Sequence, residues 1–296
     1  MTALAEPLPV PAEDVGRARE VRYFVLRSRK ILVSTVVLVF FIALAFLGPI
    51  IRPGDPNAFA GPLGAAPSPE WWFGTTTFGQ DVFAQFVYGL GSSFEVGLAG
   101  GGVAAVIAVV VGFTAGYRGG LVDEMLNMLT NVVLVIPTIA LLIVATAFLQ
   151  ARGLLVEAVF IGLTSWPWAA RAIRAQTFSL TSREFVSLAR LSGEGSGKII
   201  FREIAPNMSS YLFMMFILLF GGSILIAATL DFIGLGPSNT ISLGMMMQLS
   251  VQNAALQLHL WWWFLPPGLA IMVLVGSLYV MNVGLDEVFN PKLREM

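Results

Sequence analysis

The sequence predicts an all-α integral membrane protein with six transmembrane helices. Of its 296 residues, 56% are hydrophobic and only 12% are charged, and apolar runs long enough to span a bilayer recur along the chain. Soluble domains carry roughly 25% charged residues, so the composition excludes an ordinary soluble fold. A net charge of −1 does not indicate nucleic-acid binding. With no cysteine and one histidine, metal catalysis is not expected.

The N-terminal part is predicted to cross the membrane once and then form an external lobe. Residues 1–30 are polar and basic and read as a cytosolic segment. The apolar run 31–51 is close to the ~20 residues that a bilayer-spanning helix needs, so it predicts the first span. Residues 52–93 are rich in proline and glycine. They are too polar to span a membrane and too long for a tight turn, so they predict the lobe.

Residues 94–284 are predicted to form a transmembrane core with five further spans. A kink is expected at Pro137, because proline breaks the hydrogen-bond ladder of a helix. Small residues at four-residue spacing in the second span indicate close helix packing in lipid. The predicted spans are 94–116, 121–149, 154–173, 208–233 and 261–284, with a cytosolic loop at 181–207, an external loop at 234–260 and a cytosolic tail at 285–296.

The distribution of positive charge predicts that both termini are cytosolic. Of the 17 Lys and Arg residues, only Arg52 and Arg152 fall on the side opposite to the N-terminus. Basic residues accumulate in the cytosolic segments of membrane proteins. The polar loop 181–207 is therefore expected to face the cytosol.

The polar loop is expected to contain two short helices. Thr181 and Glu184 have the spacing of a capping box, which predicts that a helix starts there. Gly193 is placed to end this helix with a left-handed residue. A second short helix over 196–203 is expected to stop before Pro206, which would open the next long helix. A structured helix pair between two spans indicates contact with a soluble partner.

Three acidic residues, Glu95, Glu157 and Asp231, fall in or near the predicted spans. An ionisable residue within a membrane segment is a candidate functional residue by default. Each of the three lies near a predicted external boundary. Two interpretations of these acids are therefore possible from the sequence: they lie at a boundary or pore mouth, or they contact the substrate directly.

The stretch around Lys198 looks like a phosphate-binding loop but lacks two of its required residues. Ser192 stands where the motif needs glycine, and Ile199 stands where it needs serine or threonine. The chain is therefore not expected to bind or hydrolyse ATP by itself.

The polar loop resembles the EAA loop of the permease subunits of bacterial ATP-binding-cassette importers, with Gly193 and Pro206 at the motif's conserved glycine and proline places. The wider sequence is similar to the dipeptide, oligopeptide and nickel permease subfamily. Departures include Ser187 and Leu188 in place of Glu-Ala, and Asp231 in place of serine. The stretches that carry the similarity are Trp72–Gly89, Gly112–Asp123, Val133–Pro137, Ala228–Gly236, Trp261–Met272 and Phe289–Arg294.

The resemblance implies the type I ABC importer permease fold and a C-type subunit in the bacterial cytoplasmic membrane. It implies a heterodimer with a second permease, two cytosolic ATPase subunits that carry ATP and Mg²⁺, and an external substrate-binding protein. The chain itself would have no catalytic residue, cofactor or metal. Short peptides are the expected cargo, with nickel or another small solute as the alternative. A secondary transporter would need inverted repeats and acids near the midplane, which the sequence does not show.

The resemblance also assigns roles in coupling to the ATPases. Gly193 and Pro206 are expected coupling residues because they stand at the motif's glycine and proline positions, and Arg183, Glu184 and Arg190 are expected to fix the loop's orientation. The predicted contact residues are Phe185, Val186, Leu188 and Ala189.

Overall fold

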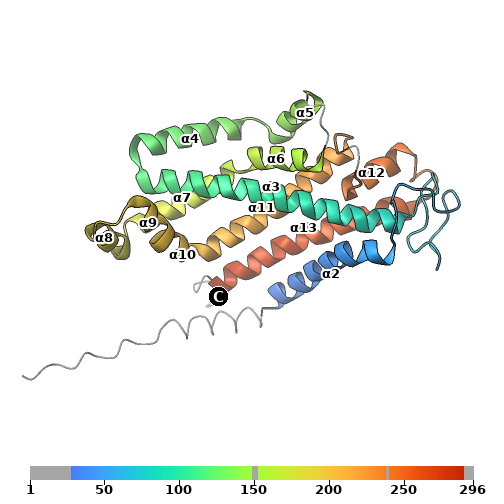
Figure 1. Cartoon of the computed structure of the whole chain (residues 1–296), viewed down its shortest axis with the longest axis horizontal. Helices are drawn as coiled ribbons and strands as arrows, with labels where there is room; N and C mark the ends of the chain where they lie inside the picture. The colour runs from blue at the N-terminus through green and yellow to red at the C-terminus, as the bar shows by residue number, and fades with distance from the viewer. Residues whose placement is uncertain (1–27, 149–152, 238–239, 290–296) are drawn as a thin grey trace, which may run out of the picture.

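The computed structural model describes residues 28–148, 153–237 and 240–289, which form a bundle of long helices (Figure 1). An irregular segment, 52–81, lies at one end of the bundle, and the short helices of the polar loop lie at the other. The elements are α2 (Arg29–Ile51), α3 (Val82–Arg118), α4 (Gly120–Val135), α5 (Thr138–Phe148), α6 (Leu154–Ser165), α7 (Pro167–Thr181), α8 (Glu184–Leu191), α9 (Ser196–Ile199), the π-helical turn η1 (Ile200–Ile204), α10 (Ala205–Asn207), α11 (Ser209–Phe232), α12 (Leu243–Gln252) and α13 (Trp261–Phe289).

Within the described residues, four helices are long and apolar enough to cross a bilayer: α2, α3, α11 and α13. A fifth span is possible if α4 and α5 are counted together, although they are bent by 75° across a break. Pro137 lies at this break, so it does more than kink one continuous helix. The structure therefore supports an all-helical membrane fold with four to five spans. The predicted six are not all present as single helices.

The predicted span 154–173 is wrong as a single helix, because α6 ends at Ser165 and α7 begins at Pro167. Proline lacks an N–H group, so the carbonyl of Leu163, four residues earlier, loses its helical partner. The indole Nε1–H of Trp166 donates to this carbonyl at 3.1 Å instead. The side chain next to the break thus satisfies the group that the break leaves unpaired.

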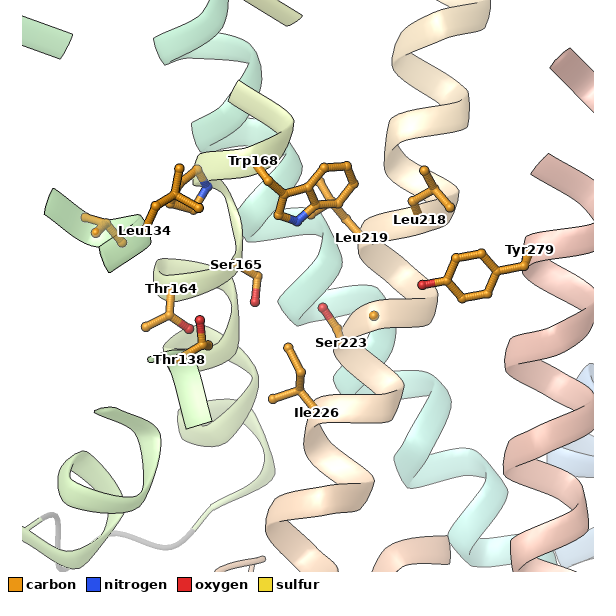
Figure 2. Close-up of a pocket in the computed structure, with 13 residues that line it drawn as sticks. Leu134, Thr138, Thr164, Ser165, Trp168, Leu218, Leu219, Ser223, Ile226 and Tyr279 are labelled. Atoms are coloured by element: carbon orange, nitrogen blue, oxygen red, sulfur yellow. The ribbon is translucent and has the colours of Figure 1, made fainter. Parts of the chain in front are cut away.

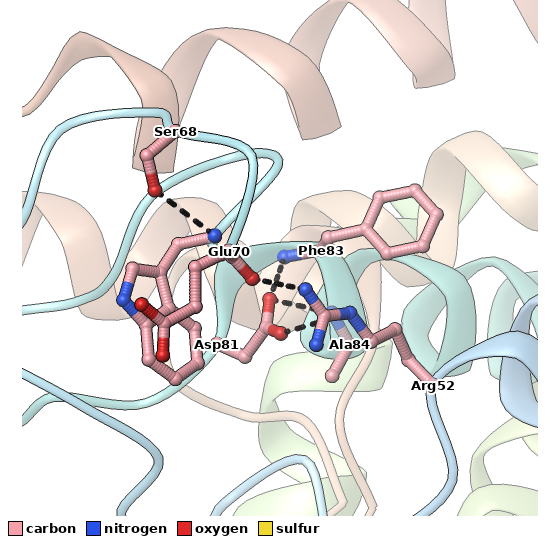
Figure 3. Close-up of polar contacts among 7 residues, drawn as sticks. Arg52, Ser68, Glu70, Asp81, Phe83 and Ala84 are labelled. Carbon is pink, nitrogen blue, oxygen red and sulfur yellow. Dashed lines mark hydrogen bonds and ion pairs between the residues drawn. The ribbon is translucent and has the colours of Figure 1, made fainter.

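Helix α3 begins at Val82, so residues 82–93 belong to a helix and not to the predicted lobe. Asp81 caps it, accepting hydrogen bonds from the backbone N–H groups of Phe83 at 2.8 Å and Ala84 at 3.2 Å. Arg52 lies 3.6 Å from the same carboxylate and also donates to the carbonyl of Glu70 (Figure 3). These contacts join the end of α2, the irregular segment and the start of α3.

Helix α3 is the central element, packing against α6, α7 and α11. Its glycines permit the close approach that the four-residue spacing predicts. A Cβ atom at Gly101 would lie 2.8 Å from the Cα of Phe220, and one at Gly116 would lie 2.7 Å from the carbonyl oxygen of Arg174. The interpretation of these glycines as packing residues is confirmed.

The start of α2 and the end of α13 lie together at the end of the bundle that carries the polar loop (Figure 1). Lys30 and Glu287 form an ion pair there. Helix α13 continues to Phe289, so residues predicted as the start of the tail are helical. The remaining predictions for the N-terminal segment and the tail concern residues 1–27 and 290–296, outside the described part.

Candidate functional site

The polar loop 181–207 does not begin with the predicted capping box. Helix α7 extends to Thr181, and its hydroxyl donates to the carbonyl of Phe178 at 2.7 Å. Helix α8 begins at Glu184 after Arg183, which makes no side-chain capping hydrogen bond. The threonine is still inside the preceding helix, so its hydroxyl bonds back to its own turn.

Gly193 ends α8 as the sequence predicts. Its φ is +75°, in the left-handed region that favours glycine. The Gly193 N–H donates to the carbonyl of Arg190 at 3.0 Å, and the next N–H, of Glu194, donates to Ala189 at 3.2 Å. These bonds use carbonyls that would otherwise lack partners at the helix end.

The second half of the loop is more helical than predicted. It runs from Ser196 to Asn207, with a π-helical turn at Ile200–Ile204. Pro206 lies inside this segment and does not open the next long helix, which begins at Ser209. A π-turn next to a proline is a common way to absorb an interrupted hydrogen-bond ladder.

The inner face of the loop is locked onto the bundle. Val186, Ile199 and Ile204 are at most 1% exposed and share one hydrophobic cluster with residues of α3 and α7. The guanidinium of Arg190 lies 5.1 Å from the ring centroid of Tyr117 at the end of α3. Val186 therefore cannot be a contact for a partner in this arrangement, and Arg190 holds α8 onto its own chain.

The outer face of the loop exposes large apolar side chains. Leu188 is 63% exposed, Leu191 85% and Phe201 72%. Leu188 and Leu191 are three residues apart and therefore share a face of α8. Arg183 and Glu184 are exposed beside them, whereas Phe185 and Ala189 are half-buried against the bundle. Sequence reasoning missed Leu191 and Phe201, although the apolar i, i+3 pair on a polar helix was a usable signal.

Two of the three predicted acids meet inside the protein. Glu157 on α6 is 6% exposed and Asp231 on α11 is 2% exposed, and their carboxyl groups are close enough to interact electrostatically. The hydroxyl of Ser242 donates to Asp231 Oδ2. Among the described residues, no donor group contacts either oxygen of Glu157. Glu95 is exposed and lines a separate apolar groove between α2, α3, α11 and α13.

Replacing Glu157 of the carboxyl pair by the neutral residue glutamine is expected to stabilise the protein. Two adjacent carboxyl groups in an apolar interior are an unfavourable arrangement, because they lose their solvation and their like charges repel. In Glu157→Gln the amide can donate to Asp231 Oδ1, which has no partner. One such bond contributes about 1 kcal/mol, so the midpoint of thermal unfolding in detergent is expected to rise by roughly 2–4 °C.

The exposed acid on α3 provides the control for this measurement. Glu95→Gln removes a carboxylate from the same protein without touching the pair, and it is expected to leave the midpoint unchanged. A lower midpoint for Glu157→Gln would contradict the assignment of an uncompensated carboxyl pair.

A pocket of about 450 Å³ lies where the two helix breaks face α11 (Figure 2). Val133, Leu134 and Thr138 come from the break between α4 and α5, and four residues come from the break between α6 and α7. Figure 2 shows hydroxyl groups and the Trp168 indole around this space. The lining residues are Val133, Leu134, Thr138, Thr164, Ser165, Pro167, Trp168, Leu218, Leu219, Gly222, Ser223, Ile226 and Tyr279. Sequence reasoning named none of these as site residues, because it treated 154–173 as one span.

Within residues 28–148, 153–237 and 240–289, no cluster of three or more His, Cys, Asp or Glu side chains is arranged to hold a metal ion. Three features of the described residues can be related to function: the exposed loop face, the pocket at the helix breaks and the buried carboxyl pair.

A bundle of apolar helices, four of them long enough to cross a bilayer among the described residues, defines a multi-pass membrane protein. Residues 108–295 match the family described as binding-protein-dependent transport system inner membrane component, and the chain belongs to this family, the permease subunits of ABC importers. It is 31% identical over 299 residues to a dipeptide transport system permease protein of Alkalihalophilus pseudofirmus, covering 98% of this chain and 96% of the relative. A putative peptide transport system permease protein of Brucella suis is 31% identical over 300 residues, covering 99% of each chain.

Proposed function

We propose that this chain forms half of the translocation pathway of an ATP-driven importer of short peptides and couples to cytosolic ATPase subunits through the loop 181–207. The observation that carries this proposal is the two-sided character of the loop. Its inner face is buried against α3 and α7, and its outer face presents Leu188, Leu191 and Phe201. Large apolar side chains outside a bundle mark a surface that a partner covers.

The complete transporter would contain a second, homologous permease subunit, two ATPase subunits that bind ATP and Mg²⁺, and an extracytoplasmic substrate-binding protein. The family description supports the dependence on a binding protein. The chain would lie in a bacterial cytoplasmic membrane with both termini in the cytosol and segment 52–81 outside. Two observations support this orientation: the bias of basic residues and the pairing of the start of α2 with the end of α13.

The loop would act as a rigid lever. When the ATPases close on nucleotide, they displace α8, and the buried contacts transmit this displacement to α3 and α7. Helix α7 begins at the Pro167 break, and α3 packs on α6 and α11. A movement of the loop therefore reaches the walls of the pocket at the helix breaks. This is a rigid-body coupling that requires packed, not flexible, connections.

The peptide cargo rests on the relatives, whose names specify dipeptide or peptide transport. Uptake by the complete transporter in proteoliposomes tests it, with labelled dipeptides and Ni²⁺ offered in parallel. ATP-dependent accumulation of the dipeptide is expected. Accumulation of nickel without accumulation of the dipeptide would show that nickel, and not a peptide, is the cargo. Uptake by this chain without ATPase subunits would overturn the importer mechanism.

Gly193 provides a test of the lever. Gly193→Val places a β-branched residue at φ +75° in otherwise open space, which costs about 1–2 kcal/mol in the left-handed conformation. We expect normal membrane insertion but at least a several-fold loss of substrate-stimulated ATP hydrolysis, because α8 changes direction at its end.

Gly195 is the matched control, since it also lies in open space but has φ −70° and ψ 150°, which any residue adopts. Gly195→Val is expected to retain coupling. Equal ATP hydrolysis in the two variants would remove the coupling role of Gly193.

A further inference from the structure

We infer that the pocket at the two helix breaks binds the main chain of the transported peptide, through uncharged hydroxyl and backbone groups. This inference rests on the proposed peptide cargo and names the part of the cargo that the membrane subunit recognises. It would make this subunit indifferent to the charge of the peptide's side chains.

The pocket contains hydrogen-bonding groups that lack partners. Ser223 is 1% exposed, and its Oγ has no hydrogen bond within the described part of the chain. The Oγ of Ser165 is also buried without a partner. Figure 2 shows both hydroxyl groups directed toward the space between α6 and α11, whereas the Tyr279 hydroxyl points from α13 toward α11. A buried hydroxyl without a partner is destabilising, so a ligand that forms a hydrogen bond with it binds more tightly.

The two helix breaks also bring backbone N–H donors and C=O acceptors to the pocket. Helix α7 starts at Pro167 without a side-chain cap, so the N–H groups of Trp168 and Ala169 in its first turn lack intrahelical acceptors. Helix α4 ends at Val135, just before the break, where the last carbonyls of a helix lack donors. A peptide bond carries one donor and one acceptor, which matches this mixture of free N–H, C=O and hydroxyl groups.

The lining also indicates what the pocket does not bind. None of its thirteen described lining residues is charged. A peptide terminus, a charged side chain or a bare metal ion would be poorly solvated there and would have no counter-charge. The remaining walls are apolar and include Leu134, Leu219 and Ile226. A volume of about 450 Å³ is within the usual range for small-ligand sites.

The pocket lies at a depth expected for a substrate-binding site within a transport pathway. Ser223 lies near the middle of α11, which runs from Ser209 to Phe232 and is long enough to span the bilayer. Binding near the midplane at broken helices allows one site to be reached alternately from each side.

The test compares a peptide with its ester analogue in the complete transporter. Alanyl-alanine and the corresponding depsipeptide differ only by the N–H of the central bond. The wild-type transporter is expected to take up the peptide with a KM about tenfold lower than that of the ester. In the double variant Ser165→Ala/Ser223→Ala, we expect the KM for the peptide to rise about tenfold, because two hydrogen bonds are lost. The preference over the ester should then fall to near parity.

Thr229→Ala is the matched control on α11, because its hydroxyl donates to Leu225 within the helix and does not line the pocket. It is expected to behave like wild type. A double variant that keeps the wild-type preference, or loses peptide and ester uptake equally, would overturn main-chain recognition while leaving peptide import intact. If the wild-type transporter takes up no peptide, the proposed function fails first, and this inference with it.

Discussion

Replacing Leu191 by aspartate is expected to detach the ATPase subunits from this permease. Leu191 is 85% exposed at the end of α8 and makes no contribution to the buried cluster beneath it. Burying a leucine side chain at an interface contributes about 1.5–3 kcal/mol, and a charged replacement also has to be desolvated. We therefore expect the affinity for the ATPase subunits to fall roughly 10- to 100-fold, with a corresponding loss of substrate-stimulated ATP hydrolysis. Co-purification at defined salt concentration and hydrolysis in proteoliposomes measure the two effects.

Leu191→Met serves as the control, because it conserves volume and apolar character and is expected to retain docking. Phe201→Asp provides an independent second variant on the other half of the loop and should act in the same direction. Val186→Asp should behave differently, destabilising the permease itself, because Val186 is fully buried. Wild-type affinity in both Leu191→Asp and Phe201→Asp would show that the ATPases bind elsewhere.

The contrast between Val186 and Leu191 shows where sequence reasoning about the loop succeeds and where it stops. The short helices and the left-handed Gly193 depend on local interactions, so the sequence predicts them. Which face of α8 is buried depends on α3 and α7, which lie far away in the sequence. The predicted contact Val186 therefore lies on the inner face, and the exposed Leu191 was not named.

Some of the membrane spans are predicted by the sequence and others are not, for the same reason. Hydropathy predicts α2, α11 and α13 closely, because each is a continuous apolar run. The break before Pro167 was missed, since a single proline in an apolar run is compatible with either a kink or a complete stop. The pocket depends on that break. The meeting of Glu157 and Asp231 likewise depends on the contact between α6 and α11, which one sequence does not reveal.

Substitution of Gly101 by valine is expected to have the largest effect on the fold. A Cβ atom there would lie 2.8 Å from the Cα and 2.9 Å from the backbone N of Phe220. These are backbone atoms of α11, so they cannot move aside as a flexible side chain can. Separating α3 from α11 would also displace the wall of the pocket formed by Leu218–Ser223. Overpacking of this kind costs about 1–3 kcal/mol or more, and we expect the unfolding midpoint to fall by roughly 5–10 °C.

The adjacent glycine provides a control within the same helix turn. A Cβ atom at Gly102 would have no atom within 4 Å, so Gly102→Val makes the same chemical change without a clash. We expect Gly102→Val to retain both the unfolding midpoint and peptide uptake, while Gly101→Val loses both. Because helix propensity and added volume are equal in the two variants, only the approach of α11 separates them. Similar midpoints for both would mean that α3 and α11 do not approach each other this closely in the membrane.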